Sequence, residues 1–240
     1  MGRAIDMEYE CGLAINGRPL SWYGAMALLD YSIGETELTA ETFQGVNRTS
    51  WSLLKSFFGR RVISVTILFE SRDLHSAKIQ RSKLNAELFG RVELFISDDG
   101  FFYDCVCTNL GAEEHAGQGE RSAQIKATYT FMGVRRSALE KITVPIGGSF
   151  YCKSTMPFTD CRLTATVGAS VSAYTLGGAT WSDVEAGDVL VFDGITGAIT
   201  RNGQPYAANV NWTNFPALTS GENVNDAADP VVVEYYPTFI

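Results

Sequence analysis

The C-terminal part of the chain reads VLVFDGITGAITRNG at 189–203, FPALTSGEN at 215–223 and VVVEYYP at 231–237. Each stretch contains a short run of β-branched or aromatic residues, and Asn202-Gly203 is a turn signal between two such runs. Short strands separated by turns at this spacing are typical of antiparallel β-sandwiches. No helical periodicity is found after residue 148, and strands are expected at 161–167, 172–176, 189–192, 198–201, 208–212 and 231–236.

Upstream of this region, two segments alternate apolar and polar residues with the period of a half-buried strand. Residues 63–69 place Ile63, Val65, Ile67 and Phe69 on one face, and residues 124–132 show the same pattern. Residues 92–96 and 101–108 flank the turn signal Asp98-Asp99-Gly100, which predicts a hairpin. The sequence therefore predicts an antiparallel sheet in the N-terminal half.

One helix is expected between these strands, at residues 74–89. Leu74, Ala77, Leu84 and Leu88 recur at three- and four-residue multiples, so they share one helix face. We expect Ser71 to cap the helix and Gly90 to end it.

The remaining N-terminal segments are less regular. We expect β-like pieces at 7–15 and 25–33 with a turn at Asn16-Gly17, and loops at 34–49 and 111–122. Residues 51–58 form a short apolar piece whose type the pattern does not decide. Long loops in compact domains are often functional or become ordered against a partner. The predicted organisation is an α+β domain at 1–136, in which one helix lies across an antiparallel sheet, a linker at 137–148 and an all-β sandwich at 149–240.

The charge distribution argues against a nucleic-acid-binding surface. The 240 residues carry a formal net charge of −8, and residues 148–240 hold three bases against nine acids, a balance of −6. No stripe of Lys and Arg is present, and gripping a phosphate backbone needs several bases on one face. With 45% hydrophobic and 12% aromatic residues, the composition is that of a globular protein.

The cysteine pattern does not indicate a disulfide framework or a zinc site. The chain has five cysteines, an odd number, and Cys105 and Cys107 point the same way on one expected strand. No second Cys-x-Cys or His pair supplies the remaining zinc ligands, so we expect reduced thiols and no metal. The N-terminal residues lack the pattern of a secretion signal and no apolar run approaches the length of a membrane span, so we expect synthesis in the cytosol and no membrane insertion.

Catalytic patterns are sparse, and we expect neither an enzyme nor a cofactor. The two histidines, His75 and His115, are not beside a serine or cysteine motif, and G-x-S-x-G is absent. A glycosidase would need two facing carboxylates, for which the sequence offers Asp183, Glu185, Asp188 and Asp193. Residues 222–229 contain oxygen ligands suited to calcium but lack the regular order of a calcium loop, so a turn is the preferred interpretation.

Carbohydrate binding is the main alternative function that the residues suggest. Trp181, Tyr206 and Trp212 could offer flat apolar platforms, while hydrogen bonds could come from Arg201, Asn209 and Asn211. Aromatic residues in strands, however, usually fill the core. The candidate sugar contacts are Trp181, Arg201 and Trp212.

The order of these segments resembles the distal tail (Dit) proteins of long-tailed, non-contractile bacteriophages and prophages. The resemblance covers nearly the whole chain: the strand, helix, hairpin and strand of 63–132 resemble the family's N-terminal belt domain. The C-terminal domain resembles the family's galectin-like sandwich through VLVFD at 189–193, the Asn202-Gly203 turn, FPALTSGEN and the terminal VVVEYYP. Residues 1–40 match less well.

This resemblance implies a structural hub located at the tail tip of a virion and made in the host bacterial cytoplasm. The implied assembly is a homo-oligomeric, six-fold ring in the baseplate. Its implied partners are the tail tube protein, a tail-tip or tail-associated protein and receptor-binding proteins, with DNA only as cargo passing through the ring. A galectin-like fold does not itself imply sugar recognition. Galectin-type sites use a histidine, which residues 149–240 lack.

Overall fold

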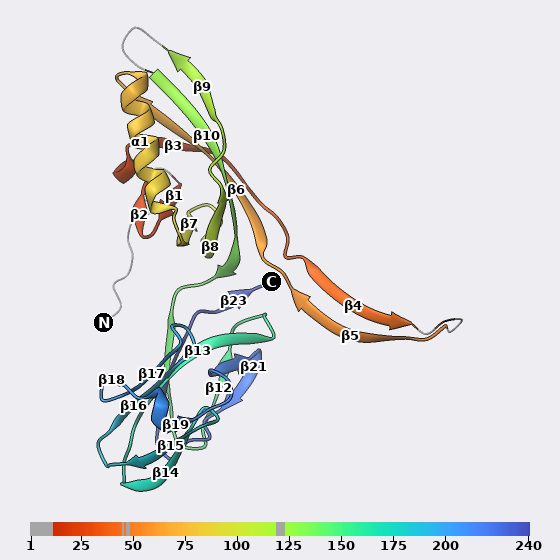
Figure 1. The fold of residues 1–240 in the computed structure, drawn as a ribbon, viewed down its shortest axis with the longest axis vertical. Coiled ribbons are helices and arrows are strands. Elements are labelled where there is room, and N and C mark those ends of the chain that lie inside the picture. Colours follow the sequence, from red (N-terminus) through yellow and green to blue (C-terminus); the bar gives the residue numbers. More distant parts are fainter. Residues whose placement is uncertain (1–11, 45, 47–48, 119–122) are drawn as a thin grey trace. The chain divides into compact units, whose positions relative to one another are not determined.

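A computed structural model describes residues 12–44, 46, 49–118 and 123–240 of the chain (Figure 1). The chain divides into two compact units, one ending at Arg135 and including Ile240, the other spanning Arg136–Phe239. The first unit is α+β and the second contains strands and one short 3-10 turn. The predicted class, an α+β part followed by an all-β part, is confirmed at this level.

The first unit is built on a sheet with the strand order β2-β1-β7-β8-β10-β6-β3, and β9 also pairs with β10. Its strands are β1 (Leu13–Ile15), β2 (Arg18–Pro19), β3 (Ala25–Ile33), β6 (Arg61–Ser71), β7 (Arg91–Ile96), β8 (Phe101–Asn109), β9 (Glu113–Gln118) and β10 (Ala123–Arg136). A 3-10 turn, η1 (Leu20–Tyr23), precedes β3.

The two strands with the clearest alternation pair with each other at the centre of this sheet. β6 and β10 run antiparallel over eleven residue pairs, from Ala123 opposite Ser71 to Gly133 opposite Arg61. Alternate residues on both strands are buried, including Ile63 and Phe69 on β6. The predicted strands at 63–69 and 124–132 are therefore confirmed, each extending a few residues further than the pattern showed.

The predicted helix forms as α1 (Leu74–Glu87), but its cap is not the predicted one. Asp73 is the N-cap, and its side chain accepts a hydrogen bond from the backbone N–H of Ser76 at 2.9 Å. The expectation that Ser71 caps the helix was wrong because Ser71 is the last residue of β6, still in the ladder opposite Ala123. An Asp at this position satisfies a backbone donor that the helix leaves free.

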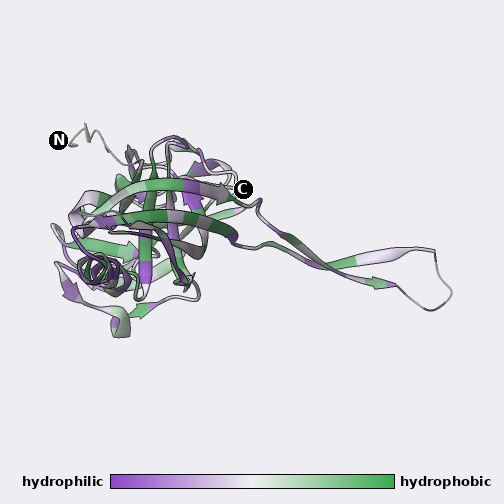
Figure 2. Cartoon of the chain, turned by 90° about the horizontal axis from the view of Figure 1, so that it is seen from above, coloured by the Kyte–Doolittle hydropathy of each residue, from purple (hydrophilic) through white to green (hydrophobic). Residues whose placement is uncertain are grey.

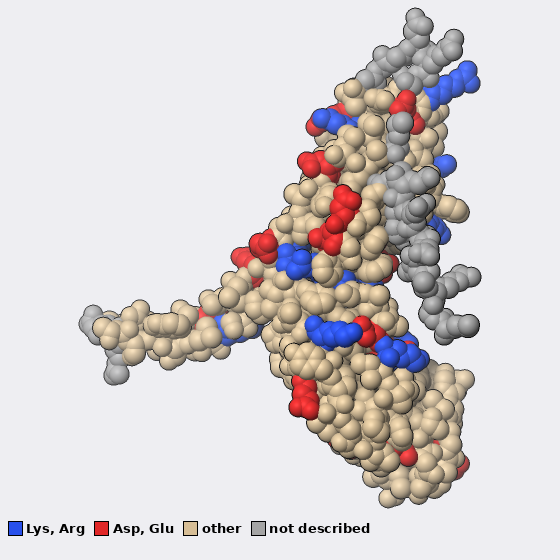
Figure 3. Space-filling view, turned by 180° about the vertical axis from the view of Figure 1, so that it is seen from behind, with Lys and Arg blue, Asp and Glu red and all other residues tan. Residues whose placement is uncertain are grey.

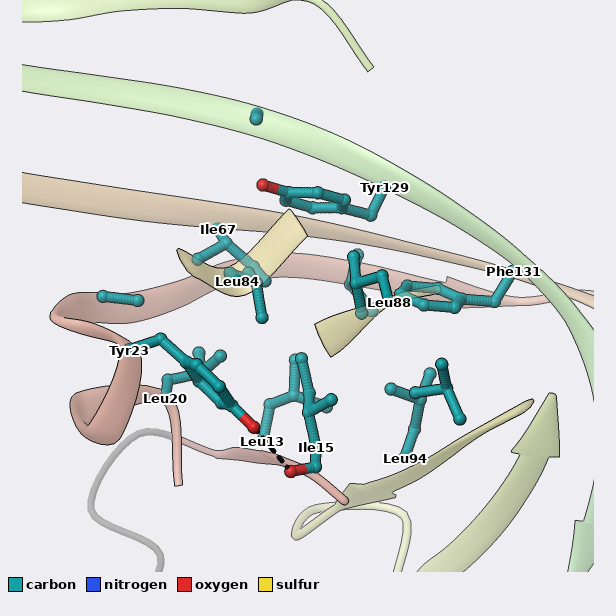
Figure 4. Packing of buried hydrophobic residues seen from close by; sticks show 14 of the residues in the cluster. Leu13, Ile15, Leu20, Tyr23, Ile67, Leu84, Leu88, Leu94, Tyr129 and Phe131 are labelled. Carbon is teal, nitrogen blue, oxygen red and sulfur yellow. Dashed lines mark hydrogen bonds between the residues drawn. The ribbon is translucent and has the colours of Figure 1, made fainter. Parts of the chain in front are cut away.

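The apolar face of α1 packs onto one face of the sheet (Figure 4). Ala77, Leu84 and Leu88 are buried there with side chains from the central strands, including Ile67, Tyr129 and Phe131. Tyr23 joins this core from η1 and donates a hydrogen bond to the carbonyl of Ile15 at 3.1 Å. Burial of aliphatic and aromatic side chains is the main stabilising contribution of such a core.

Two turn predictions are also confirmed. Asn16 and Gly17 both have positive φ and join β1 to β2, as a tight hairpin requires. Gly100 has φ 74° in the turn between β7 and β8, which pair from Arg91 opposite Val106 to Ile96 opposite Phe101. The expected strand at 7–15 lies partly outside the described residues; its described end forms β1.

Two segments expected as loops contain strands. Residues 34–49 include β4 (Leu38–Gln44), which pairs with β5 (Trp51–Phe58), and residues 111–122 include β9. The loop predictions were wrong because these strands lack the one-sided burial that produces alternation. Every residue of β4 and β5 is exposed or half-exposed.

The second unit contains several small sheets around its own core. The largest has the order β11-β22-β13-β16-β17-β18, with β20 also pairing with β13; β14-β15-β19 and β12-β21 form two more. Its strands are β11 (Glu140–Val144), β12 (Ser149–Cys152), β13 (Phe158–Thr166), β14 (Val171–Leu176), β15 (Ala179–Val184), β16 (Val189–Asp193), β17 (Ala198–Arg201), β18 (Gln204–Pro205), β19 (Val210–Asn211), β20 (Ala217–Thr219), β21 (Gly221–Val224), β22 (Val231–Tyr235) and β23 (Thr238–Phe239).

Five of the six strands predicted in this region are present: 198–201 has the predicted ends as β17, and the other four differ by one to three residues at an end. The exception is 208–212, where a 3-10 turn, η2 (Ala207–Asn209), precedes the two-residue β19. Trp181, Phe192 and Tyr235 are fully buried members of the shared core. In the described part of the chain, no helix has the length and apolar character needed to cross a membrane.

Candidate assembly interface

The most unusual surface of the first unit is the hairpin of β4 and β5, which we call the arm (residues 38–58). The arm continues the β3–β6 hairpin: the N–H of Gly34 donates to the carbonyl of Val62 at 2.8 Å, and that of Gly59 donates to the carbonyl of Glu37 at 2.7 Å. Figure 1 shows β4 and β5 as a two-stranded ribbon that extends β3 and β6. The arm is therefore joined to the core sheet by an almost unbroken ladder.

Both faces of the arm carry exposed apolar side chains. Residues opposite each other in an antiparallel ladder lie on the same face. Thr39 opposite Phe57 and Phe43 opposite Ser52 share one face, while Leu38 opposite Phe58 and Gln44 opposite Trp51 share the other. The large exposed apolar residues described between 38 and 58 are Leu38, Phe43, Val46, Trp51, Leu53, Leu54 and Phe57.

This density of exposed apolar residues distinguishes the arm from an ordinary surface loop. Trp51 is 63% exposed and Leu54 66% exposed. Figure 2 shows hydrophobic segments along both strands of the arm, and most of its surface in Figure 3 is neither acidic nor basic. Contiguous apolar patches on a free chain commonly mark sites of protein–protein contact. Because none of the described residues covers either face, the arm is a candidate for burial in an assembly.

The root of the arm is fixed by a buried arginine. Arg61 is 3% exposed, and its Nη1 donates to the carbonyl of Gly34 at 3.0 Å and to the carboxylate of Glu35 at 3.3 Å. Arg61 is the first residue of β6 and Gly34 follows the last residue of β3, so this hydrogen bond holds the end of β3 beside the start of β6. The root is thus more strongly held than the exposed distal part.

The core sheet of the first unit also ends in strands with an open side. β3 and β2 are the terminal members of its strand order, so in the described residues each pairs along one side only. An open strand edge presents unpaired backbone donors and acceptors that another chain can complete. The described sheet therefore has two edges, at β2 and β3, along which a strand of another chain could pair.

The sheet face opposite α1 is rich in hydroxyl groups. Ser64 and Thr66 on β6 lie beside Thr130 and Thr128 on β10, and the hydroxyls of Thr66 and Thr128 are 2.9 Å apart. These side chains are half-exposed or exposed. The same face also carries Glu70 and Lys126, and Lys126 pairs with Glu114 at 2.8 Å. A surface without an excess of positive charge offers little attraction to a polyanion.

The residues proposed for sugar contact lie in the second unit but do not form a common platform. Trp181 is fully buried, and its ring stacks on Tyr206 with centroids 6.0 Å apart. Trp181 therefore offers no surface to a sugar. Trp212 is partly exposed and packs against Phe215 at 4.7 Å, while Arg201 donates to the hydroxyl of Tyr206 at 3.1 Å and pairs with Asp188 at 2.5 Å. Sugar contact by Arg201 and Trp212 stays a prediction.

Two of the four acids considered for glycoside hydrolysis, Asp188 and Asp193, have structural roles. Asp193 accepts hydrogen bonds from Ile195, Thr196 and Arg162, and burial alone would raise its pKa, but these bonds hold the pKa below its usual value. Asp188 accepts from the N–H of Glu185, and this bond, with Arg201, also lowers its pKa. A general acid needs a raised pKa, so this pair does not fit that role.

No metal-binding cluster of three or more His, Cys, Asp or Glu side chains occurs in the described residues. In the 222–229 segment, Asn223 and Asn225 hold the local turns: Asn223 accepts from the N–H of Thr219 at 3.0 Å, and Asn225 donates to the carbonyl of Asp229 at 3.0 Å. The turn interpretation is therefore supported for residues 225–229, whereas residues 222–224 belong to β21 and pair with β12. Cys105, Cys107, Cys152 and Cys161 are free thiols, and Cys11 lies outside the described residues.

Comparisons with solved structures bear on the whole chain. The Dit protein of phage SPP1, described as a paradigm of the hub adsorption apparatus in phages that infect Gram-positive bacteria, matches with a TM-score of 0.70 over 95% of this chain and 99% of that chain, at 12% identity. Baseplate structures of phage p2 in its activated conformation, with Sr and with Ca, match with a TM-score of 0.51 at 6% identity; both cover 88% of this chain and 89% and 90% of theirs.

Comparisons of the sequence, by contrast, give no match. No family model matches the chain, and no curated protein sequence matches it. At 6–12% identity the structural matches establish the fold. The predicted resemblance to distal tail proteins is confirmed at that level: along nearly its full length, this chain has the fold of a phage tail-tip hub protein.

Proposed function

We propose that the chain is a structural component of a phage tail tip, a distal tail protein that forms a ring and performs no catalysis. The observation that carries the proposal is the match of 95% of the chain to the SPP1 Dit hub protein. A shared fold does not by itself transfer a function. The proposal therefore also rests on the surfaces that such an assembly needs, which are the arm and the open edges of β2 and β3.

In this proposal, residues 1–136 form the belt domain that builds a six-fold ring, 137–148 are a linker, and 149–240 are a galectin-like sandwich. The arm of one copy packs on the belt of its neighbour, which covers Trp51 and Leu54, and open sheet edges are completed between copies. A closed ring satisfies every such edge, whereas an open chain of subunits leaves two unsatisfied. The same apolar surface would favour aggregation in a free chain.

The ring would connect the tail tube protein on one side to tail-tip and receptor-binding proteins on the other. The face of β6 and β10 that carries the hydroxyl groups suits the wall of a channel for DNA, because its lysine, Lys126, is paired with Glu114 and it has no excess of positive charge. The net charge of −8 acts in the same direction. Synthesis in the host cytoplasm and a final location at the tail tip follow from this role.

The test is assembly. The full chain is expressed alone and together with the tail tube and tail-tip proteins of its phage, and products are examined by native mass spectrometry and electron microscopy. We expect a six-copy species, or incorporation as a ring at the tip of assembled tails. A chain that stays monomeric alone and is also left out of tails when its partners are present contradicts the proposal.

A further inference from the structure

A groove in the second unit runs along the outer edge of β14. Two cavities are lined jointly by β14 and the 223–229 segment: one of about 220 Å³ at the Leu176 end and one of about 410 Å³ at the Val171 end. Asp226 lines both cavities, so they adjoin along the same edge. The groove combines three features that each select a different part of a ligand.

The first feature is an open backbone edge. β14 is a terminal strand of the order β14-β15-β19 and, in the described residues, pairs only with β15, from Val171 opposite Val184 to Leu176 opposite Ala179. The β12–β21 sheet that supplies the other wall is not joined to it by a ladder. An edge of this length can accept an added strand.

The second feature is an apolar slot at the Leu176 end. It is lined by core side chains, among them Phe150, Leu163, Val231 and Val233. Phe150 lies on β12, Leu163 on β13, and Val231 and Val233 on β22, so the slot reaches the core of the second unit. It has room for an apolar side chain or two and no charged group other than Asp226 on its wall.

The third feature is an acidic end. Asp226 and Asp229 line the larger cavity together with Tyr174. Asp229 accepts a hydrogen bond from the N–H of Gly168 at 3.1 Å. Burial, together with the charge of Asp229 and its hydrogen bond with the Tyr174 hydroxyl, raises the pKa of Tyr174 to about 12. Asp226 is exposed at the junction of the two cavities, so its carboxylate faces any ligand in the groove.

We propose that the β14 edge binds an extended peptide segment of a partner protein, which adds a strand beside β14, places an apolar side chain in the slot and a Lys or Arg beside Asp226 and Asp229. Each requirement follows from one feature: the backbone edge selects a strand, the slot an apolar residue and the carboxylates a cation. The net charge of −6 over residues 148–240 draws a basic segment to this unit.

The proposal is independent of ring formation, because the groove lies wholly within the second unit and needs one copy. It is tested with synthetic nine-residue peptides that alternate valine and threonine and carry one lysine, placed at the N-terminal end in one isomer and at the C-terminal end in the other. Binding to the full-length chain is measured by isothermal titration calorimetry. We expect one isomer to bind with a Kd below about 1 mM.

Three matched comparisons decide the interpretation. A peptide with alternate backbone nitrogens methylated should bind at least about tenfold more weakly, because it loses two or more backbone hydrogen bonds. Asp226→Asn should weaken binding about three- to fivefold, the effect of removing one partly exposed charge pair. Asp226 is exposed, so this change leaves the core intact, and the control Asp183→Asn removes an exposed acid outside the groove and should leave the Kd unchanged.

The outcomes separate cleanly. If neither isomer binds at roughly 1 mM, the groove is not a peptide site. If the methylated peptide binds as well as its parent, an apolar ligand rather than a strand occupies the groove and the proposal fails. If Asp226→Asn and Asp183→Asn weaken binding equally, the attraction is only the general charge of the unit, and the assignment of the cation to Asp226 and Asp229 is overturned.

Discussion

Replacing Trp51 on the arm should break the proposed ring without unfolding the chain. In the free chain Trp51 is 63% exposed, so the Trp51→Ala change removes little that the folded monomer uses. Exposed substitutions of this kind alter the free energy of unfolding by about 0.5 kcal/mol or less. The melting temperature of the monomer should therefore stay close to that of the unsubstituted chain.

The cost to association follows from the area still available for burial. An aromatic side chain buries about 150–250 Å² when fully covered, and 63% of that is roughly 95–160 Å². At about 25 cal/mol per Å², covering this area contributes roughly 2–4 kcal/mol to each interface, which is a factor of about 30 to 1,000 in the association constant. The range is that of an interface hot spot.

Sedimentation velocity over a concentration series measures this change, with Phe158→Ala as the matched control. Phe158 is 69% exposed, similar to Trp51, but lies at the start of β13 in the second unit. If the isolated chain does not form rings, the same pair is compared by incorporation into tails. Ring formation by Trp51→Ala equal to that of the unsubstituted chain, or an equal loss with Phe158→Ala, refutes the assignment of the arm as the ring contact.

Three further predictions concern the folded chain itself. Leu84→Ala, in the buried face of α1, should lower the free energy of unfolding by about 2–5 kcal/mol in denaturant titrations; a loss below about 1 kcal/mol would show that α1 is not packed as described. Asp193→Ala should cost the second unit about 2–4 kcal/mol through unpaired donors at Ile195, Thr196 and Arg162. Because the pKa of Asp193 is lowered on folding, its contribution is complete above about pH 4–5 and is lost as the pH falls through the folded pKa, so thermal melts of the two proteins should converge in acid. Burial raises the pKa of the Cys105 and Cys161 thiols to about 12, so a thiol reagent at neutral pH should modify them only after unfolding, and rapid labelling of the native chain would contradict their burial.

The sequence predicted best those elements with one buried and one exposed face. Ile63 to Phe69 alternate because β6 lies between the core and a polar surface, and the same asymmetry gave the helix face of Leu84 and Leu88. The cap was misplaced because both Ser71 and Asp73 are good capping residues, and only the length of β6 excludes Ser71.

The arm was missed for the opposite reason. Against the part of the chain that the structure describes, its strands have no buried face, so WSLLKSFF at 51–58 shows no alternation, and Gly34 with the polar residues after it resembles a loop. One signal in the sequence could have revealed the arm. The segment between Gly34 and Gly59 contains many large apolar residues that follow neither a helical nor a strand period. Trp181 shows the converse error, since an aromatic residue in a strand was considered for ligand contact when it fills the core.

The ladder that links the arm to the core also has a mechanical consequence. The bonds at Gly34 and Gly59, together with the hydrogen bond from Arg61 to the carbonyl of Gly34, tie the described start of β4 and end of β5 to the ends of β3 and β6. If the arm is the contact between subunits of the proposed ring, a load on β4 and β5 passes to β3 and β6 through these backbone hydrogen bonds. Separating the subunits would then require breaking hydrogen bonds between paired strands, and not only apolar contacts at the surface of the arm.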